Sequence, residues 1–224
     1  LNSYVEECDC APRRAFLSSS AIDRLVLASG GVPRDFFTLC ASAIQVARKR
    51  PNVRAAGVQD VNEAAGMAAK AKIEELEDDA AASAGGAEKV LNVLNRFRRF
   101  LIEENRTVFF KIEFRDKEAN PENYTLVQRL ADLRMLHLIN SSISDPHQAG
   151  VRYEIYLLDL SEYSGSRLKR NLRVLDFREG HMTLRETGVK DDEIVGNTSL
   201  RLVSMLRSGP VFNLDQLHDL VSCR

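Results

Sequence analysis

The sequence lacks three features that would each define a class of protein. It contains no run of 18 apolar residues, so we expect no transmembrane helix. No positively charged segment followed by an apolar stretch opens the chain, so we predict no secretory signal. The net charge is only −1, which excludes a strongly basic protein that coats nucleic acid.

Cysteine is scarce as well. The four cysteines (Cys8, Cys10, Cys40 and Cys223) do not form the spaced pairs of a disulfide framework. Cys8 and Cys10 match half of a metal site, but no second pair of Cys or His lies at ligand spacing. We therefore predict no metal site, and reduced thiols in a cytoplasmic protein.

With 224 residues the chain can form one large domain or two small ones, and its first part has a helical pattern. Ser18, Ser19 and Ser20 offer N-caps to a helix over about 20–28. Apolar residues at helical spacing predict two more helices, over about 33–50 and 58–78. We therefore predict an all-helical unit over residues 1–80.

The turn between the first two predicted helices lies in "LVLASGGVPRDFFTLC", residues 25–40. Gly30 and Gly31 suit a helix end, and Pro33 suits the first position of the next helix. Arg34 follows at once, although the helix dipole disfavours a cation there. The pattern indicates that another group contacts this guanidinium.

After residue 80 the sequence changes character. "AAASAGGAEK" predicts a flexible linker over 81–87 that is sensitive to proteases. An amphipathic helix follows, then a strand at "TVFFKIEF", a helix over about 121–136, and the two strands of a hairpin at "LHLINS" and "VRYEIYLLD". This order is typical of a winged helix, which we predict for residues 88–178.

In a winged helix, the helix before the hairpin is the recognition helix. Its predicted buried stripe consists of Leu126, Leu130 and Leu133, with Val127 less cleanly placed. Its predicted outer face consists of Thr125, Gln128, Arg129 and Asp132. Gln128 and Arg129 are residue types that read base edges or hold phosphate, whereas Asp132 argues against tight DNA binding.

The charge distribution is compatible with nucleic acid but weak. Residues 88–178 carry a net charge of +3, while 1–87 and 179–224 carry −2 each. The predicted phosphate contacts are Arg152, Arg167, Lys169, Arg170 and Arg173, four of them in "RLKRNLR". A solvated face explains this basic segment equally well.

The remaining segments give fewer signals. We predict a helical extension over 179–224, with short helices capped by Asn197 and Asn213. This extension is either the start of another helix-turn-helix or a helical hairpin that packs on the rest. His137 is predicted to be a packed strand residue, and no histidine has a nucleophile or carboxylate at a catalytic spacing, so we expect no catalysis by this chain alone.

The order of these parts, from "SGGVPRDF" to the basic segment, resembles the C-terminal region of AAA+-type ATPases of the origin-recognition-complex-like group, including their bacterial relatives. The resemblance covers roughly residues 20–178. It implies that Arg34 is the sensor-2 arginine of a helical lid and reaches the γ-phosphate of ATP, with Gly31 and Pro33 setting the turn. It also implies ATP and Mg²⁺ for the parent protein, and an ATPase core, double-stranded DNA or neighbouring subunits as partners.

One departure from that family is clear. The sequence has no G-x-x-x-x-G-K-[ST] loop and no apolar strand ending in paired acids. The chain is therefore not a complete ATPase: we expect the C-terminal portion of a longer protein, and the alternative is a degenerate relative that kept the lid and lost the core. The predicted fold is mainly α with a small β component, a helical lid bundle followed by a winged helix. Its predicted function is that of a regulatory, DNA-associated module, and the alternative is a protein-interaction or oligomerisation module without DNA contact.

Overall fold

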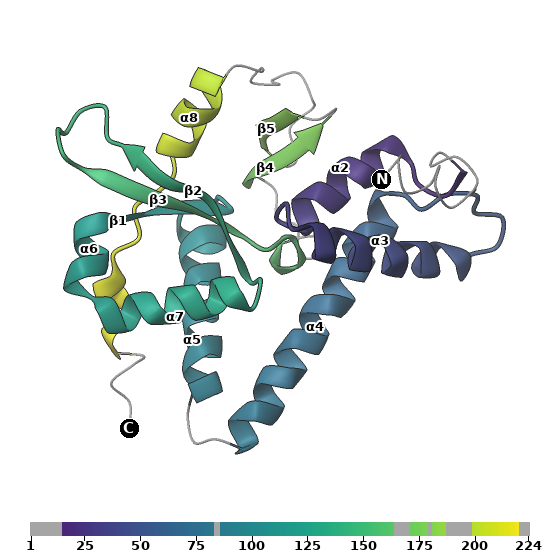
Figure 1. The fold of residues 1–224 in the computed structure, drawn as a ribbon, viewed down its shortest axis with the longest axis horizontal. Helices are drawn as coiled ribbons and strands as arrows, with labels where there is room; N and C mark the ends of the chain where they lie inside the picture. The colour runs from purple at the N-terminus through teal and green to yellow at the C-terminus, as the bar shows by residue number, and fades with distance from the viewer. Residues whose placement is uncertain (1–14, 83–85, 164–170, 179–180, 187–198, 220–224) are drawn as a thin grey trace.

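The computed structural model describes residues 15–82, 86–163, 171–178, 181–186 and 199–219. The structure is mixed α/β, and most of its regular residues are helical, as the sequence predicted. Three N-terminal helices lie to one side, and a three-stranded sheet with its own helices lies to the other (Figure 1).

The N-terminal helices are α2 (Ser19–Ala28), α3 (Pro33–Arg48) and α4 (Val58–Ala82). The Ser18 side chain accepts a hydrogen bond from the Ala21 amide, which confirms the predicted cap of α2. Pro33 occupies the first turn of α3, also as predicted. Both helices pack against α4, where small buried residues such as Ala43 permit close approach.

The next helix, α5 (Gly86–Arg98), runs in the opposite direction to α4 (Figure 1). A π-helical segment, η2 (Arg99–Glu104), follows α5 directly. α4 continues four residues past the predicted end at Asp78. Residues 83–85, in the middle of the predicted linker, lie outside the described residues, so protease sensitivity there stays a prediction.

The larger sheet follows. Its elements in chain order are β1 (Phe109–Glu113), α6 (Phe114–Ala119), α7 (Pro121–Asp132), β2 (Leu136–Ser144) and β3 (Arg152–Leu158). β3 lies in the centre, and it pairs antiparallel with β1 on one side and β2 on the other.

Two details of this segment differ from the prediction. α6 was not predicted, and α7 was predicted to run to Leu136. α7 ends earlier because Arg134 has a φ of 60°, which takes the chain out of the helix. Leu136 is already the first residue of β2.

A second, two-stranded sheet consists of β4 (Arg173–Arg178) and β5 (His181–Glu186). The prediction of a purely helical extension beyond residue 179 is wrong for β5. The basic residues before β4 masked the strand pattern, although Val174 and Leu175 are fully apolar and buried.

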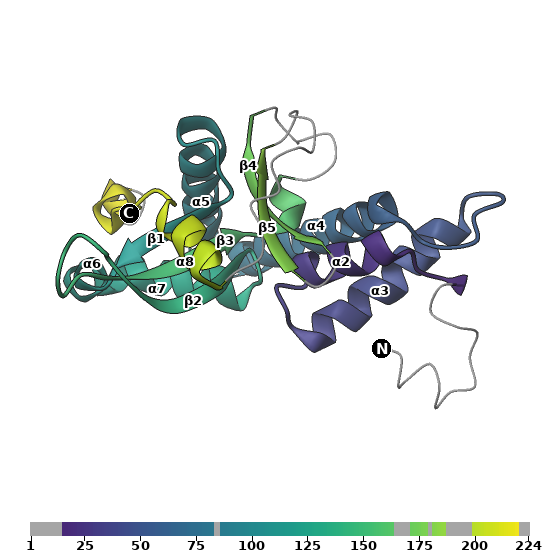
Figure 2. The same ribbon diagram turned by 90° about the horizontal axis from the view of Figure 1, so that it is seen from above.

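The C-terminal segment packs on the larger sheet. α8 (Ser199–Arg207) contacts β1, and both views show it beside the sheet (Figures 1 and 2). The Lys111 amide donates to the Pro210 carbonyl, and the Phe212 amide donates to the Lys111 carbonyl, each at 2.9 Å. The chain thus covers the outer edge of β1. The described part of the extension packs on the rest of the protein, but through an extended segment along β1 rather than as the predicted helical hairpin.

A short 3₁₀ helix, η5 (Leu214–Leu217), completes this segment. The Asn213 side chain accepts a hydrogen bond from the Asp215 amide, so the predicted cap is confirmed. Asn197, the other predicted cap, lies outside the described residues.

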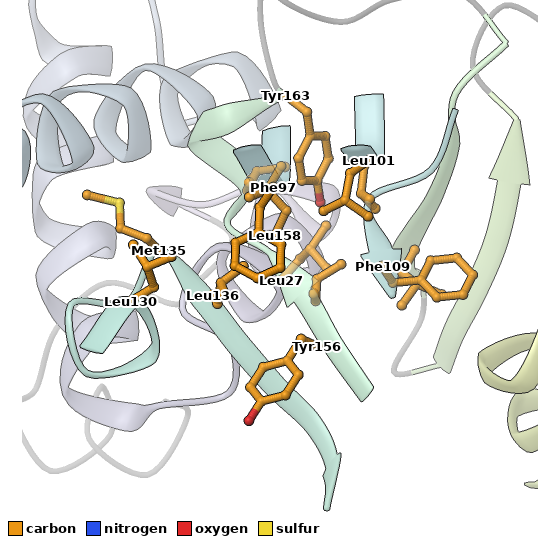
Figure 3. Close-up of a cluster of buried hydrophobic side chains, with 14 of the residues drawn as sticks. Leu27, Phe97, Leu101, Phe109, Leu130, Met135, Leu136, Tyr156, Leu158 and Tyr163 are labelled. Atoms are coloured by element: carbon orange, nitrogen blue, oxygen red, sulfur yellow. The ribbon is translucent and has the colours of Figure 1, made fainter. Parts of the chain in front are cut away.

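One hydrophobic core connects the two predicted units. Leu27 of α2 belongs to the same buried cluster as Leu136 of β2 and Leu158 of β3 (Figure 3). A 3₁₀ helix after β3, η3 (Leu160–Glu162), contacts both α2 and α4. The helices of the first unit therefore share buried surface with the sheet of the second.

Candidate functional site

Arg34 begins α3 directly after a turn made by the end of α2. The Gly31 amide donates to the Val26 carbonyl, and the Gly30 amide donates to the Leu27 carbonyl, which is the Schellman arrangement of a helix end. Both glycines have positive φ, 56° for Gly30 and 79° for Gly31. Gly31 and Pro33 thus shape the turn as predicted.

The Arg34 side chain itself is exposed. It makes no hydrogen bond or ion pair with any residue that the structure describes. Val32, at the N-cap position, supplies no side-chain cap, so the first amides of this 16-residue helix also lack a capping side chain. The start of α3 therefore presents a guanidinium and the positive end of a helix dipole together.

Gly30 has a second role that the sequence did not indicate. A Cβ atom at Gly30 would overlap the imidazole of His137 at Nδ1 and would lie 2.7 Å from its Cε1. At Gly31 a Cβ atom would meet nothing within 4 Å. The backbone of the turn therefore lies directly against His137 of β2.

His137 is buried on β2, as predicted, and it has a partner that is distant in sequence. Its Nε2 atom lies 2.8 Å from Oδ2 of Asp159, which is also buried. Oδ1 of Asp159 accepts hydrogen bonds from the amide and the hydroxyl of Ser161. With Nε2 bound by Asp159 and Nδ1 facing Gly30, the ring favours a packing role over proton transfer to a substrate.

The pairing of β2 with β3 explains why the spacing of residues did not reveal this contact. The strands run antiparallel, with His137 of β2 opposite Leu157 of β3, so Asp159 lies two residues beyond the partner of His137 and its side chain can reach the imidazole across the strands. A hydrogen bond between residues 22 positions apart has no local signal, because it depends on strand register.

A second contact connects α3 to the end of α7. Nε of Arg134 lies 3.6 Å from Oδ2 of Asp35, the residue that follows Arg34. Asp35 lies in the first turn of α3, where its charge also suits the helix dipole. The turn around Arg34 is thus in contact with β2 through Gly30 and with the α7–β2 connection through Asp35.

A cavity of about 360 Å³ lies at this contact. The lining residues come from the turn, the end of α7 and the start of β2: Gly30, Val32, Ala131, Asp132, Arg134, Leu136, His137 and Leu138. Its walls combine apolar and polar surface in similar amounts, and Asp132 and Arg134 carry charges of opposite sign. Arg34 is not among the lining residues.

The outer face of α7 is largely as predicted. Thr125, Gln128, Arg129 and Asp132 are all exposed. The buried face is centred on Val127 and Leu130, whereas Leu126 and Leu133 are only partly buried. The buried face of α7 thus differs from the predicted stripe by about one residue. It also includes Asn123, whose side-chain amide donates a hydrogen bond to the Leu214 carbonyl.

A polar network beneath α7 holds that helix on the sheet. Glu154 of β3 accepts hydrogen bonds from Lys117 of α6 at 2.6 Å and from Tyr124 of α7 at 2.8 Å. Burial lowers the pKa of Lys117 and the contact with Glu154 raises it, with a net rise. Burial, together with Tyr124 and Glu154, also raises the pKa of Tyr156, whose hydroxyl donates to Glu154. These contacts orient the exposed face of α7.

The predicted phosphate contacts do not form one patch in the described residues. Arg152 is exposed at the hairpin end of β3, while Arg173 lies near the opposite end, half-buried over the Phe109 ring at 5.9 Å. The seven residues of β3 separate them by about 20 Å, at about 3.3 Å per residue. Arg167, Lys169 and Arg170 lie outside the described residues.

Two further properties concern only the described residues. None of their helices is long and apolar enough to cross a membrane. They include no group of three or more His, Cys, Asp or Glu side chains suited to holding a metal ion. Cys8 and Cys10, which match half of a metal site in the sequence, lie outside this part of the chain.

Sequence reasoning missed Gly30, Asp35, Arg134 and Asp159 as contact residues of this region. The sequence held one signal for these contacts. Arg134 occupies the position after the end of α7 where glycine is usual, so an arginine there suggests a side chain with a specific partner. Comparisons of this chain with protein-family models, with curated proteins and with solved structures each found no match.

Proposed function

We propose that this chain is the C-terminal regulatory module of an ATP-binding protein, acting in the cytoplasm. Helices α2, α3 and α4 would form the lid, and the segment from α5 to β3 would form a winged helix. The observation that carries the proposal is the order helix, strand, helix, helix, strand, strand with β3 in the centre of the sheet. This winged-helix order follows the three lid helices, the second of which, α3, presents Arg34.

Arg34 is the residue proposed to contact nucleotide. Its exposed guanidinium, which has no hydrogen-bond or ion-pair partner among the described residues, suits charge-assisted contacts to the γ-phosphate of ATP held by an ATPase core, in the same or a partner chain. The core would supply the phosphate loop and Mg²⁺, and Gly31 and Pro33 would set the direction of Arg34. Bound phosphate would also offset the unfavourable position of a cation at the start of a helix.

We expect Arg34→Ala to lower the ATPase rate of the complete protein by about 10- to 100-fold, the effect of losing a charged hydrogen bond. The melting temperature should stay within about 1 °C, because the side chain is exposed and makes no hydrogen bond or ion pair with a described residue. Arg48→Ala, at the exposed far end of the same helix, is the control and should leave the rate unchanged. An unaltered rate for Arg34→Ala would remove the nucleotide assignment.

We further propose that the exposed face of α7 contacts double-stranded DNA. Gln128 and Arg129 lie on that face, and Arg152 lies on the adjacent hairpin, where a backbone phosphate contact is possible. Because the face carries one arginine and two acidic residues, Glu122 and Asp132, the binding should be weak.

The same acidic residues favour a second candidate function. The exposed face of α7 carries both signs of charge, from Glu122, Arg129 and Asp132. Such a face is electrostatically complementary to a protein surface that also carries both signs at least as well as to DNA, which is negative throughout. In this alternative, the winged helix binds a neighbouring subunit or another protein of an ATPase complex.

Three variants of α7 distinguish the candidates. If DNA is the partner, Gln128→Ala and Arg129→Ala should each weaken binding to a preferred duplex by about 5- to 150-fold, and Asp132→Asn should strengthen it. If Arg129 contacts a backbone phosphate rather than a base, Arg129→Ala should weaken binding to all duplexes alike. It should then also reduce the slope of log affinity against log salt concentration by about 1. Fluorescence anisotropy at low and moderate salt measures these effects. Absence of binding at low salt, together with an assembly defect of the same variants in sizing experiments, would favour the protein partner.

A further inference from the structure

We infer that the end of α7 positions Arg34, with Arg134 and Asp35 as the positioning residues. What Arg34 binds rests on the proposed function, but the positioning itself does not. The consequence is that any ligand of Arg34 is coupled to the exposed face of α7, and any ligand of α7 is coupled to Arg34.

The first argument is the backbone of Arg134. It occupies the left-handed position that follows a helix end: the Arg134 amide donates to the Ala131 carbonyl, and the Met135 amide donates to the Leu130 carbonyl. Glycine is the usual residue there, because a Cβ atom makes this conformation unfavourable. An arginine at such a position is conformationally costly, and its side chain reaches Asp35.

The second argument is the location of Asp35. It follows Arg34 directly, in the first turn of α3, so a contact that holds Asp35 also restricts the direction of Arg34. The two side chains of the pair are 42% and 31% exposed, so the pair contributes little to stability. Its effect is therefore on orientation rather than on folding.

The third argument is the other side of the turn. Gly30 lies against His137, whose ring is held by Asp159 in the core. The turn carrying Arg34 is thus in contact with β2 before Arg34 and with the α7–β2 connection after it. Because these contacts are contiguous, a displacement of Arg34 toward a ligand must be accommodated at the end of α7, and the coupling must be equal in both directions.

The test uses Arg134→Gly, which removes the guanidinium and also relieves the left-handed backbone, so the variant should fold at least as well as the wild type. Arg106→Gly is the matched control: Arg106 is an exposed arginine with a φ of 51°, and it lies away from α3. Asp35→Asn and the double variant complete a cycle for the pair.

Hydrogen exchange of the amides at the start of α3, from Asp35 to Thr38, is the first measurement. We expect Arg134→Gly and Asp35→Asn to speed exchange there by about 2- to 5-fold, as the loss of an exposed ion pair implies. The double variant should add nothing further, and Arg106→Gly should have no effect there. Equal exchange in Arg134→Gly and Arg106→Gly would overturn the inference.

Nucleotide binding to the complete protein is the second measurement. We expect Arg134→Gly to weaken ATP binding by about 2- to 5-fold, and Arg34→Ala to abolish that sensitivity to residue 134. If exchange changes as expected but Arg34→Ala leaves ATP binding intact, the positioning holds and the proposed function fails. If Arg134→Gly weakens ATP binding equally with and without Arg34, the coupling does not pass through Arg34 and the inference is wrong.

Discussion

Gly30→Ala should lower the free energy of unfolding by about 2–5 kcal/mol. Two costs contribute. The positive φ of Gly30 disfavours any residue with a Cβ atom, and that atom would overlap the imidazole of His137. His137 cannot move away easily, because it is buried and holds Asp159 at 2.8 Å.

The adjacent glycine provides a matched control. Gly31 also has a positive φ, but a Cβ atom there would meet nothing, so Gly31→Ala should cost only about 1–2 kcal/mol. Urea denaturation of both variants separates backbone strain from the contact with β2. In a His137→Ala background, the extra cost of Gly30→Ala over Gly31→Ala should disappear. Equal losses for the two glycine variants in the wild type would show that the turn does not press on His137.

Phe212→Ala should also destabilise the protein strongly, by about 3–5 kcal/mol. The Phe212 ring is completely buried, and its centroid lies 4.5 Å from that of Phe97 and 4.9 Å from that of Phe100. The substitution leaves a cavity at the centre of an aromatic cluster contributed by α5, η2 and β1. It also loosens the segment that covers the edge of β1.

The preceding residue serves as the control for Phe212. Val211 is 45% exposed, so Val211→Ala should change the free energy of unfolding by less than about 0.5 kcal/mol. Thermal and urea denaturation measure both variants. If Phe212→Ala had as small an effect as Val211→Ala, the C-terminal segment would be an appendage rather than part of the core.

Gly30→Ala and Phe212→Ala should both have large effects because the net free energy of unfolding of a folded domain is small. A typical domain is stable by about 5–15 kcal/mol, so each substitution removes a large fraction of that margin. Both sites lie where segments distant in sequence meet. The Gly30 contact joins α2 to β2, and the Phe212 contact joins the C-terminal segment to α5.

The sequence by itself determined the local elements whose signals are short-range. The Ser18 cap, Pro33 at the start of α3 and the Asn213 cap were all readable, because capping depends on neighbouring residues alone. The exposed face of α7, with Gln128 and Arg129, followed from helical periodicity. The hairpin of β2 and β3 followed from two apolar runs around a turn.

Only the tertiary structure decided which of these elements meet. Gly30 against His137, Arg134 beside Asp35 and Asp159 beside His137 each depend on strand register and helix packing, which no local pattern encodes. The same holds for the segment around Phe212. Its short apolar pattern does not indicate whether it is an appendage or part of the core, and only its hydrogen bonds to Lys111 at the edge of β1 decide this. The candidate site of this protein is therefore a product of long-range packing: residues with ordinary local roles acquire their contacts only when α2, α7 and β2 come together.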